Sequence, residues 1–401
     1  MTSHEYVILR TPDAGMLTRE ATVLRPRMTV APESGALSVS VEKLSKAEVS
    51  ESRRDPSVLA VAPSMPVTLI KPLASSAAPA GLAPGPTWGV RAVDAHNSPY
   101  DGSEVVVAIL DTGIDKNHAG FAGIAGRIVE EDFSGSGNGD RQGHGTHVAG
   151  TVFGQDVNGV RIGIARNIKK ALIGKVLDDG GSGSTAGIFN AIQWADREGA
   201  DIMSMSLGID FPGMVDSLIA QGMPAPLATS VALEAYRSTL RLFDTLSASL
   251  RARAMFDNTS TFVCAAAGNE SRRNGAPAFE LTAAPPGAAD GFVSVAALGT
   301  GDNGATLFVA PFSNTGANVA APGMDVFSAK AGTANGLVAF NGTSMATPHV
   351  AGVAALWADK VRKDEGAVAH SILMARLTGS CKRLPMLGVL DVGLGMPQAP
   401  R

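Results

Sequence analysis

The most constraining feature of the chain is an alternation of apolar runs and helix-like segments between residues 104 and 208. Residues 104–110 (EVVVAIL) form a nearly continuous run of β-branched and aliphatic side chains, typical of a parallel strand buried on both faces. Residues 170–176 and 201–208 have a similar strand character, and residues 188–198 between them carry apolar positions at helical spacing. This alternation predicts an α/β fold with a central, mostly parallel sheet.

Length and composition limit the partners of the chain. Its 401 residues suffice for one large α/β domain and a small accessory domain. The net charge is −4 and no dense Lys/Arg cluster is present, so no nucleic-acid partner is expected. The apolar runs are shorter than the ~20 residues that span a bilayer, so no membrane partner is expected either. No basic segment followed by an apolar core opens the chain, which predicts a cytoplasmic location unless another route of secretion operates.

Asp111 follows directly after the first buried run. In open α/β sheets, ligands and chemistry gather beyond the carboxyl ends of the parallel strands. Asp111 is therefore a candidate catalytic carboxylate. Taken alone, it could equally be a turn residue that caps the next segment.

His144 stands between two glycines in the sequence GHGTHVAG at residues 143–150, where a second Ala/Val-rich helix begins. Glycine permits close backbone approach around the imidazole. Helix capping and metal binding are the alternatives. His144 and His147 are three positions apart, but no third ligand stands at a zinc-protease spacing, so no metal site is predicted. His147 and His349 are assigned to helix packing.

Ser344 lies in NGTSMATPHVAG (341–352), at the start of a further Ala/Val-rich helix. A Gly-Thr-Ser turn alone is common, but here an aspartate and a histidine precede it. His144 could take the proton of Ser344, while Asp111 would orient the imidazole. The side-chain amide of Asn269 and the Ser344 backbone N–H could both donate to an oxyanion.

Four blocks, residues 108–115, 144–150, 265–270 and 342–352, resemble the signature blocks of the subtilisin-like serine endopeptidases, the subtilases. The resemblance covers about residues 87–401 and implies a three-layer α/β catalytic domain. It also implies peptide hydrolysis through an acyl-enzyme, with Asp111, His144 and Ser344 as the triad and Asn269 as the oxyanion donor. No cofactor is required for this chemistry.

The same resemblance implies where a peptide substrate binds. Two segments would hold an extended substrate between them, and a third would form a pocket wall. Glu270 is expected near that pocket, which could accommodate a basic side chain before the scissile bond. The implied peptide-binding residues are Gly181, Ser182, Gly183, Ser206, Leu207, Gly208, Ala266, Ala267 and Gly268.

Residues 1–71 are predicted to form a small α+β domain, and residues 72–86, rich in Pro, Ala, Ser and Gly, a linker. By resemblance, residues 1–71 are a propeptide that acts as intramolecular inhibitor or chaperone, and the linker holds the processing site. A permanently attached domain is the alternative. The expected strands of this domain are 6–9, 36–41 and 58–61, with a helix at 45–54.

Two departures from the family pattern stand out. The stretch after Gly208 is longer than in simple members, and the extra residues 209–229 are interpreted as a rim or lid on the cleft, with a surface insertion as the alternative. Asp156 and Asn158 could bind a structural calcium ion through oxygen, but Gly120 stands near the position of an expected carboxylate. Weak or no calcium binding is therefore predicted.

Two other functions stay open beside a general endopeptidase that is made as a self-processing zymogen. One is a dedicated processing protease for a single substrate. The other is a peptide-binding module that uses the same scaffold without hydrolysis.

Overall fold

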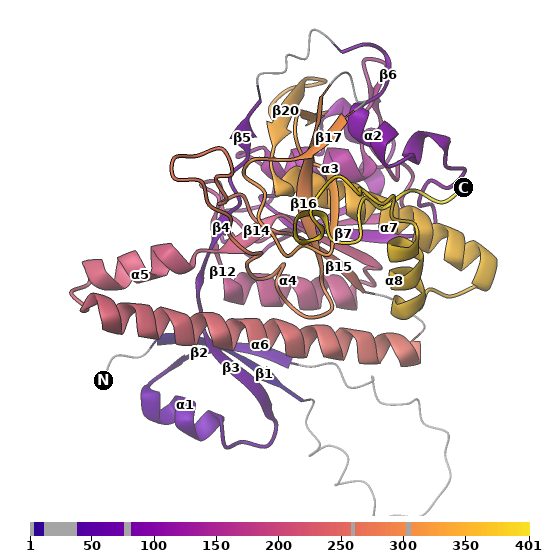
Figure 1. The fold of residues 1–401 in the computed structure, drawn as a ribbon. Helices are drawn as coiled ribbons and strands as arrows, with labels where there is room; N and C mark the ends of the chain where they lie inside the picture. Colours follow the sequence, from indigo (N-terminus) through magenta and orange to yellow (C-terminus); the bar gives the residue numbers. More distant parts are fainter. Residues whose placement is uncertain (1–3, 12–37, 76–81, 258–260, 302–305) are drawn as a thin grey trace, which may run out of the picture.

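The computed structural model describes residues 4–11, 38–75, 82–257, 261–301 and 306–401. They form a large α/β body and a small sheet-containing unit, which lie on opposite sides of the long helix α6 (Ala225–Asp257) in Figure 1.

The central sheet has the strand order β17-β16-β15-β13-β7-β11-β8, with β18 beside β16. All of its strand pairs are parallel except β16 with β17, which confirms the predicted mostly parallel sheet. Its strands are β7 (Val106–Asp111), β8 (Ile128–Asp132), β11 (Lys170–Lys175), β13 (Ile202–Met205), β15 (Phe262–Ala266), β16 (Val293–Gly301), β17 (Thr306–Val309) and β18 (Val319–Pro322).

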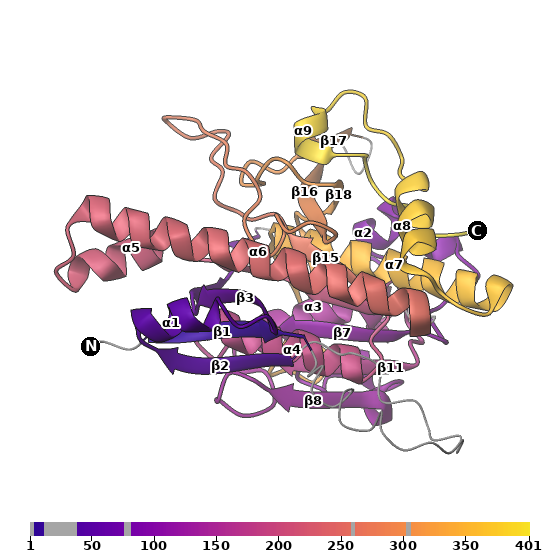
Figure 2. The same cartoon turned by 90° about the horizontal axis from the view of Figure 1, so that it is seen from below.

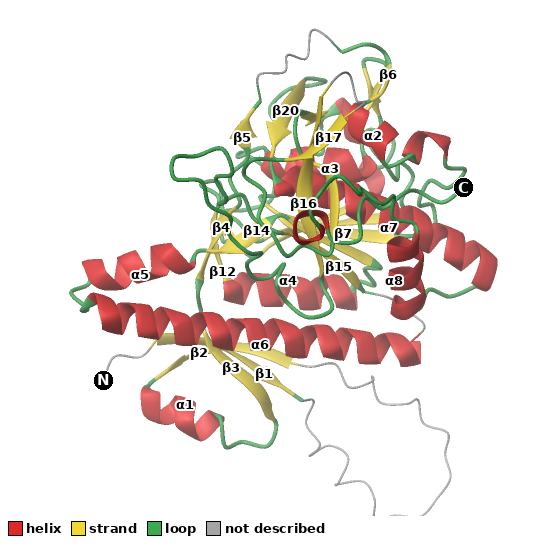
Figure 3. Cartoon of the chain, viewed as in Figure 1, coloured by secondary structure: helices red, strands yellow, loops and turns green. Residues whose placement is uncertain are grey.

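Helices cover both faces of this sheet, as Figure 3 shows by its red and yellow elements. Alternate side chains of β7 point to opposite faces. Val107 and Ile109 belong to the core shared with α3 (His144–Phe153) and α7 (Thr343–Glu365). Ala108 belongs to the second core, which contains residues of α4 (Thr185–Arg197) and α6. The domain therefore has the three layers expected.

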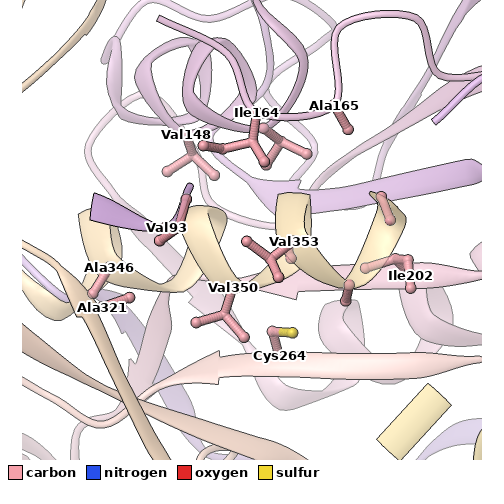
Figure 4. Packing of buried hydrophobic residues seen from close by; sticks show 14 of the residues in the cluster. Val93, Val148, Ile164, Ala165, Ile202, Cys264, Ala321, Ala346, Val350 and Val353 are labelled. Atoms are coloured by element: carbon pink, nitrogen blue, oxygen red, sulfur yellow. The ribbon is translucent and has the colours of Figure 1, made fainter. Parts of the chain in front are cut away.

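The core on the α7 face is built mostly from small and branched side chains. Val350 and Val353 of α7 lie close to Cys264 of β15 (Figure 4), and all three are buried. Burial raises the pKa of the Cys264 thiol. Cys264 is therefore a packing residue of this core.

The N-terminal unit is an antiparallel sheet of order β2-β1-β3 with one helix. Ile8 faces its own small core, whereas Val7 and Leu9 join the core shared with α4 and α6. Figure 2 shows this small sheet lying along α6. The unit is thus docked on the large domain by apolar contacts. Its elements are β1 (His4–Arg10), β2 (Ser38–Leu44), α1 (Lys46–Ser52) and β3 (Val58–Pro63).

The predicted boundary at residues 71 and 72 lies inside a stretch that pairs with strands of the large domain. β4 (Pro66–Leu69) pairs with strands of the large domain, and so do β5 (Leu73–Ala74) and β6 (Gly85–Pro86). Backbone partners that are distant in sequence turn these residues into strands, and local composition does not reveal such partners. Residues 76–81 of the expected linker lie outside the described residues.

The expected insertion, residues 209–229, contains α5 (Phe211–Ala220) and the first residues of α6. Asp210 caps α5 by accepting the Gly213 N–H at 2.8 Å. The remaining elements are α2 (Trp88–Ala92), η3 (Ala95–Asn97), η4 (Ala119–Phe121), η5 (Ala125–Arg127), β9 (Asp156–Val157), β10 (Val160–Arg161), β12 (Ser182–Ser184), β14 (Leu207–Ile209), β19 (Val326–Ala329), β20 (Leu337–Asn341), α8 (His370–Gly379) and α9 (Val389–Val392).

Candidate active site

Asp111 and His144 form a buried pair at the carboxyl edge of the sheet. Asp111 is the last residue of β7, and His144 is the first residue of α3. His144 Nδ1 lies 2.7 Å from Asp111 Oδ1. Gly145 allows this approach, because a Cβ there would lie 2.2 Å from the Gly113 carbonyl oxygen.

The surroundings of Asp111 fix the direction of this hydrogen bond. Oδ1 also accepts the Thr112 backbone N–H at 2.8 Å, so the carboxylate acts as acceptor and His144 Nδ1–H as donor. His144 Nε2 is buried and has no hydrogen-bond partner within the described part of the chain. In the neutral ring this nitrogen carries the lone pair, which is the form that a general base requires.

Ser344 occupies the first turn of α7, where backbone N–H groups have no carbonyl of a preceding turn to bond. Its Oγ lies 3.3 Å from the Ile70 carbonyl oxygen and 3.4 Å from that of Ser206. Ser206 Oγ in turn donates to the Ser344 carbonyl at 3.1 Å. The expected bond from Ser344 to His144 Nε2 is not formed in this state.

Asn269 is oriented by the residue that precedes the serine. Its Oδ1 accepts both the backbone N–H and the hydroxyl of Thr343, each at 2.9 Å. The Thr343 hydroxyl oxygen also accepts the Gly268 N–H at 3.1 Å. The Asn269 amide NH₂ is thereby turned toward a peptide carbonyl, that of Lys71, at 3.2 Å.

The Ile70 carbonyl beside Ser344 and the Lys71 carbonyl beside Asn269 belong to one segment, residues 66–74. β4 lies as the central strand between β12 and β14 and is antiparallel to both. Thr68 pairs with Ser182 on one side and with Gly208 on the other. Leu69 N–H also donates to the Gly181 carbonyl at 2.8 Å.

The segment continues past the serine on the other side. Leu73 pairs with Asn341 of β20, and Asn341 Nδ2 donates to the Ala74 carbonyl at 3.1 Å. Ile70 and Lys71 lie between these two paired stretches. An extended peptide therefore crosses the whole site, held by main-chain bonds on both sides, which is how β-strand addition binds peptides.

A pocket of about 400 Å³ opens beside Ile70. The expected wall, Ala266 to Gly268, lines it together with Gly208. Glu270 also lines it, and its Oε2 accepts from Asn314 Nδ2 at 2.7 Å. Each of the nine expected peptide-binding residues thus lies beside residues 66–74, beside Ser344 or in the wall of this pocket.

The other histidines of the two helices are buried outside the site. His147 Nε2 lies 2.9 Å from the Val326 carbonyl oxygen, and its ring stacks on Phe340. Burial lowers the pKa of His147 to about 3 and that of His349 to about 4. Both are therefore neutral packing residues at neutral pH.

The loop considered for calcium is internally paired. Asp156 forms an ion pair with Arg166 at 2.9 Å, and Asn158 Oδ1 accepts from Asn335 at 3.1 Å. Within the described ranges, no group of three or more His, Cys, Asp or Glu side chains could hold a metal ion.

Lys175 is a site residue that the sequence argument did not identify. It is 1% exposed, and its ammonium group donates to the carbonyls of Thr112 and Gly139 at 2.6 and 3.1 Å. It also contacts Asp179 Oδ1 at 2.9 Å. Lys175 therefore holds the loop that follows Asp111. The signal in the sequence is a lysine directly after the apolar run of residues 171–174.

The fold and the site together define a class: α/β proteins with an aspartate, a histidine and a serine at the carboxyl edge of a parallel sheet. The family model of the subtilase family matches residues 102–379, and the chain belongs to this family. This confirms the resemblance of the four sequence blocks.

Curated relatives agree with this assignment. Subtilisin DY of Bacillus licheniformis is 40% identical over 111 residues, which cover 27% of this chain and 39% of that protein. The subtilisin-like serine protease AsES of Sarocladium strictum is 30% identical over 354 residues, or 86% of this chain and 74% of that protein. Alkaline serine exoprotease A of Vibrio alginolyticus is 34% identical over 159 residues, which cover 35% of this chain and 28% of that protein. The chain thus spans less than half of two of these three relatives.

No helix in the described ranges is long and apolar enough to cross a membrane.

Proposed function

We propose that the protein is a serine endopeptidase that hydrolyses peptide bonds through an acyl-enzyme. The observation that supports this most directly is the position of Ser344. Its Oγ lies 3.3 Å from a peptide carbonyl oxygen, and the buried Asp111–His144 pair stands at the carboxyl edge of the same sheet.

Each residue has a defined part in this reaction. Ser344 Oγ attacks the carbonyl carbon, and its proton passes to His144 Nε2. Asp111 stabilises the imidazolium that forms. The negative charge on the former carbonyl oxygen is met by the Asn269 amide and the Ser344 backbone N–H.

His144 then donates its proton to the leaving nitrogen, and the amine departs. A water molecule then gives a proton to His144 Nε2 and attacks the acyl carbon. His144 returns this proton to Ser344 Oγ as the ester bond breaks, which releases the acid and regenerates Ser344. All of these groups are side-chain or backbone groups, so the proposed reaction needs no cofactor. Structural calcium at the Asp156 loop is not part of the proposal.

We further propose that the N-terminal domain keeps the enzyme inactive as an intramolecular inhibitor. Residues 66–74 fill both sides of the cleft. Ser344 contacts the Ile70 carbonyl, whereas Asn269 contacts the Lys71 carbonyl, so attack and oxyanion stabilisation are directed at neighbouring peptide groups. The segment must shift locally before either bond can react.

The bond proposed for self-cleavage is Ile70–Lys71. Ile70 presents its carbonyl to the nucleophile, while the following bond, Lys71–Pro72, has a proline nitrogen as leaving group. From the sequence alone, cleavage was expected within residues 72–86. The position of Ser344 favours a site just before that range.

Mass analysis and N-terminal sequencing of the expressed chain test this proposal. Wild type is expected to yield a product that begins at Lys71, whereas Ser344→Ala stays intact. Ser371→Ala, an exposed serine on α8, should process like wild type. A fluorophosphonate probe should label processed wild type at Ser344.

Two results would count against the proposal. Processing that persists in Ser344→Ala would show that another protease cuts the chain. A chain that neither processes nor reacts with the probe would instead favour the peptide-binding module. Cleavage of unfolded casein at many sites would argue against a dedicated processing protease.

A further inference from the structure

We propose that α5 and α6 build the outer wall of the pocket beside Ile70, and that Phe211 and Leu233 in this wall set how strongly the enzyme prefers an aromatic residue over a small one before the scissile bond. This inference rests on the endopeptidase function proposed above. It assigns a role to a segment that the reaction itself does not use.

The pocket lies beside the side chain of Ile70, the residue whose carbonyl faces Ser344. Ile70 is 5% exposed and lines the pocket. A Cβ added at Gly208 would lie 3.3 Å from Ile70 Cγ1, so this side chain packs directly on the backbone of β14. A pocket of about 400 Å³ in addition to the space taken by Ile70 leaves room for a larger residue.

The two helices supply one side of this pocket. Phe211 and Pro212 come from the first turn of α5, and Leu233 and Tyr236 come from α6. The Phe211 and Tyr236 rings meet edge to face, with centroids 5.8 Å apart. Two aromatic rings and a leucine offer an apolar surface, and edge-to-face contacts would favour a third ring.

The wall is held in place by the rest of α6. Leu242, Phe243 and Leu246 of this helix are at most 2% exposed in the core of the large domain. Phe243 also packs on Phe189 of α4, with centroids 4.6 Å apart. A helix anchored over its later turns carries Leu233 and Tyr236 at a fixed distance from the cleft, as a specificity pocket requires.

Each of the two carboxylates that line the pocket has one oxygen occupied by a hydrogen bond from the protein, and a basic residue is the competing occupant that the Lys peptide tests. Asp210 Oδ1 caps α5 through the Gly213 N–H at 2.8 Å. Glu270 Oε2 accepts from Asn314 at 2.7 Å. The other lining side chains contributed by the insertion are uncharged.

The test compares two leucines of α6 that have similar exposure. Leu233 is 56% exposed and lines the pocket, whereas Leu227 is 52% exposed and does not line it. The expressed full-length chain is assayed on peptides that differ only in the residue before the scissile bond: Phe, Leu, Ala or Lys. Phe211→Ala is measured as a second variant of the wall.

Wild type is expected to prefer Phe over Ala. Leu233→Ala and Phe211→Ala should lower the Phe-to-Ala ratio of kcat/KM about tenfold, the scale of small changes in an apolar pocket. Leu227→Ala should keep the wild-type ratio. Labelling of Ser344 by the fluorophosphonate probe shows for each variant that the fold and the nucleophile are intact. If Phe211→Ala does not fold, the ratio measured for Leu233→Ala decides, because Leu233 is exposed.

The outcomes separate this inference from the function on which it rests. Hydrolysis with the same Phe-to-Ala ratio in wild type, Leu233→Ala and Leu227→Ala would overturn the pocket wall and leave the endopeptidase in place. A preference for Lys that is lost in Glu270→Gln would overturn the inference and show that Glu270 selects a basic residue. If wild type neither hydrolyses a peptide nor reacts with the probe, the endopeptidase function fails, and this inference fails with it.

Discussion

His144 Nδ1 lies 2.7 Å from Asp111 Oδ1, and both side chains are fully buried. The two residues come from different elements, the end of β7 and the start of α3. Because this hydrogen bond fixes the tautomer of His144, it decides which nitrogen is available to Ser344.

Replacing Asp111 with Asn should therefore leave the fold intact but impair the base. An asparagine amide that donates to Nδ1 would favour the proton on Nε2, where it cannot accept from Ser344. The expected loss in kcat is about 10⁴, the scale known for the same Asp→Asn substitution in a serine-protease triad. Peptide hydrolysis kinetics measure it, and Asp364→Asn on the exposed end of α7 is the control. Activity of Asp111→Asn close to wild type would exclude the proposed role.

Asn269→Ala tests the oxyanion donor. Thr343 holds the Asn269 side chain through two bonds of 2.9 Å, so the amide is aligned before a substrate binds. Its removal should lower kcat about 10²- to 10³-fold with little change in KM, the range known for this donor in subtilisin. Steady-state kinetics distinguish this from a binding defect, in which KM would rise while kcat stays the same.

Lys175→Met tests the buried ammonium group behind the catalytic loop. The substitution leaves the Thr112 and Gly139 carbonyls without their donor. Removing one member of a buried charged network costs about 3 kcal/mol of unfolding free energy. Lys170→Met on the same strand is the matched control, because its ion pair with Glu198 is 30% and 40% exposed and contributes little. Urea unfolding in the Ser344→Ala background gives both values, and equal losses would contradict the role of Lys175.

The sequence predicted the elements whose signal is local. The β-branched run before Asp111 and the Ala/Val-rich stretches after His144 and Ser344 indicated a parallel strand and two buried helices, and the structure contains all three. Because the family motifs lie at the ends of these elements, the candidate triad could be named from the sequence.

β4 could not be predicted in the same way. Pro66–Leu69 becomes a strand because β12 and β14, more than a hundred residues further along the chain, offer edges on both sides. The contact of Lys71 with Asn269 likewise depends on this placement. Pairing between distant segments has no signature in local hydrophobicity, so the occupied cleft and the pocket wall of α5 and α6 emerge only from the structure.

Acidification should destabilise the fold through the buried histidines. Burial lowers the pKa of His147 from 6.5 to about 3 and that of His349 to about 4. Below about pH 6.5 the unfolded chain binds protons at these side chains that the folded protein does not bind. Unfolding free energy should therefore be constant with respect to these groups above about pH 6.5 and fall as the pH drops toward about 4.

His147→Gln, made in the Ser344→Ala background to prevent self-digestion, isolates one of these groups. A glutamine amide can still donate to the Val326 carbonyl but does not titrate, so the fall in unfolding free energy between about pH 6.5 and pH 4 should become shallower. His96→Gln, at an exposed position, should keep the parent slope. Thermal or urea unfolding across this range measures the slopes. A His147→Gln slope equal to that of the parent would mean that the proton uptake on unfolding comes from other groups.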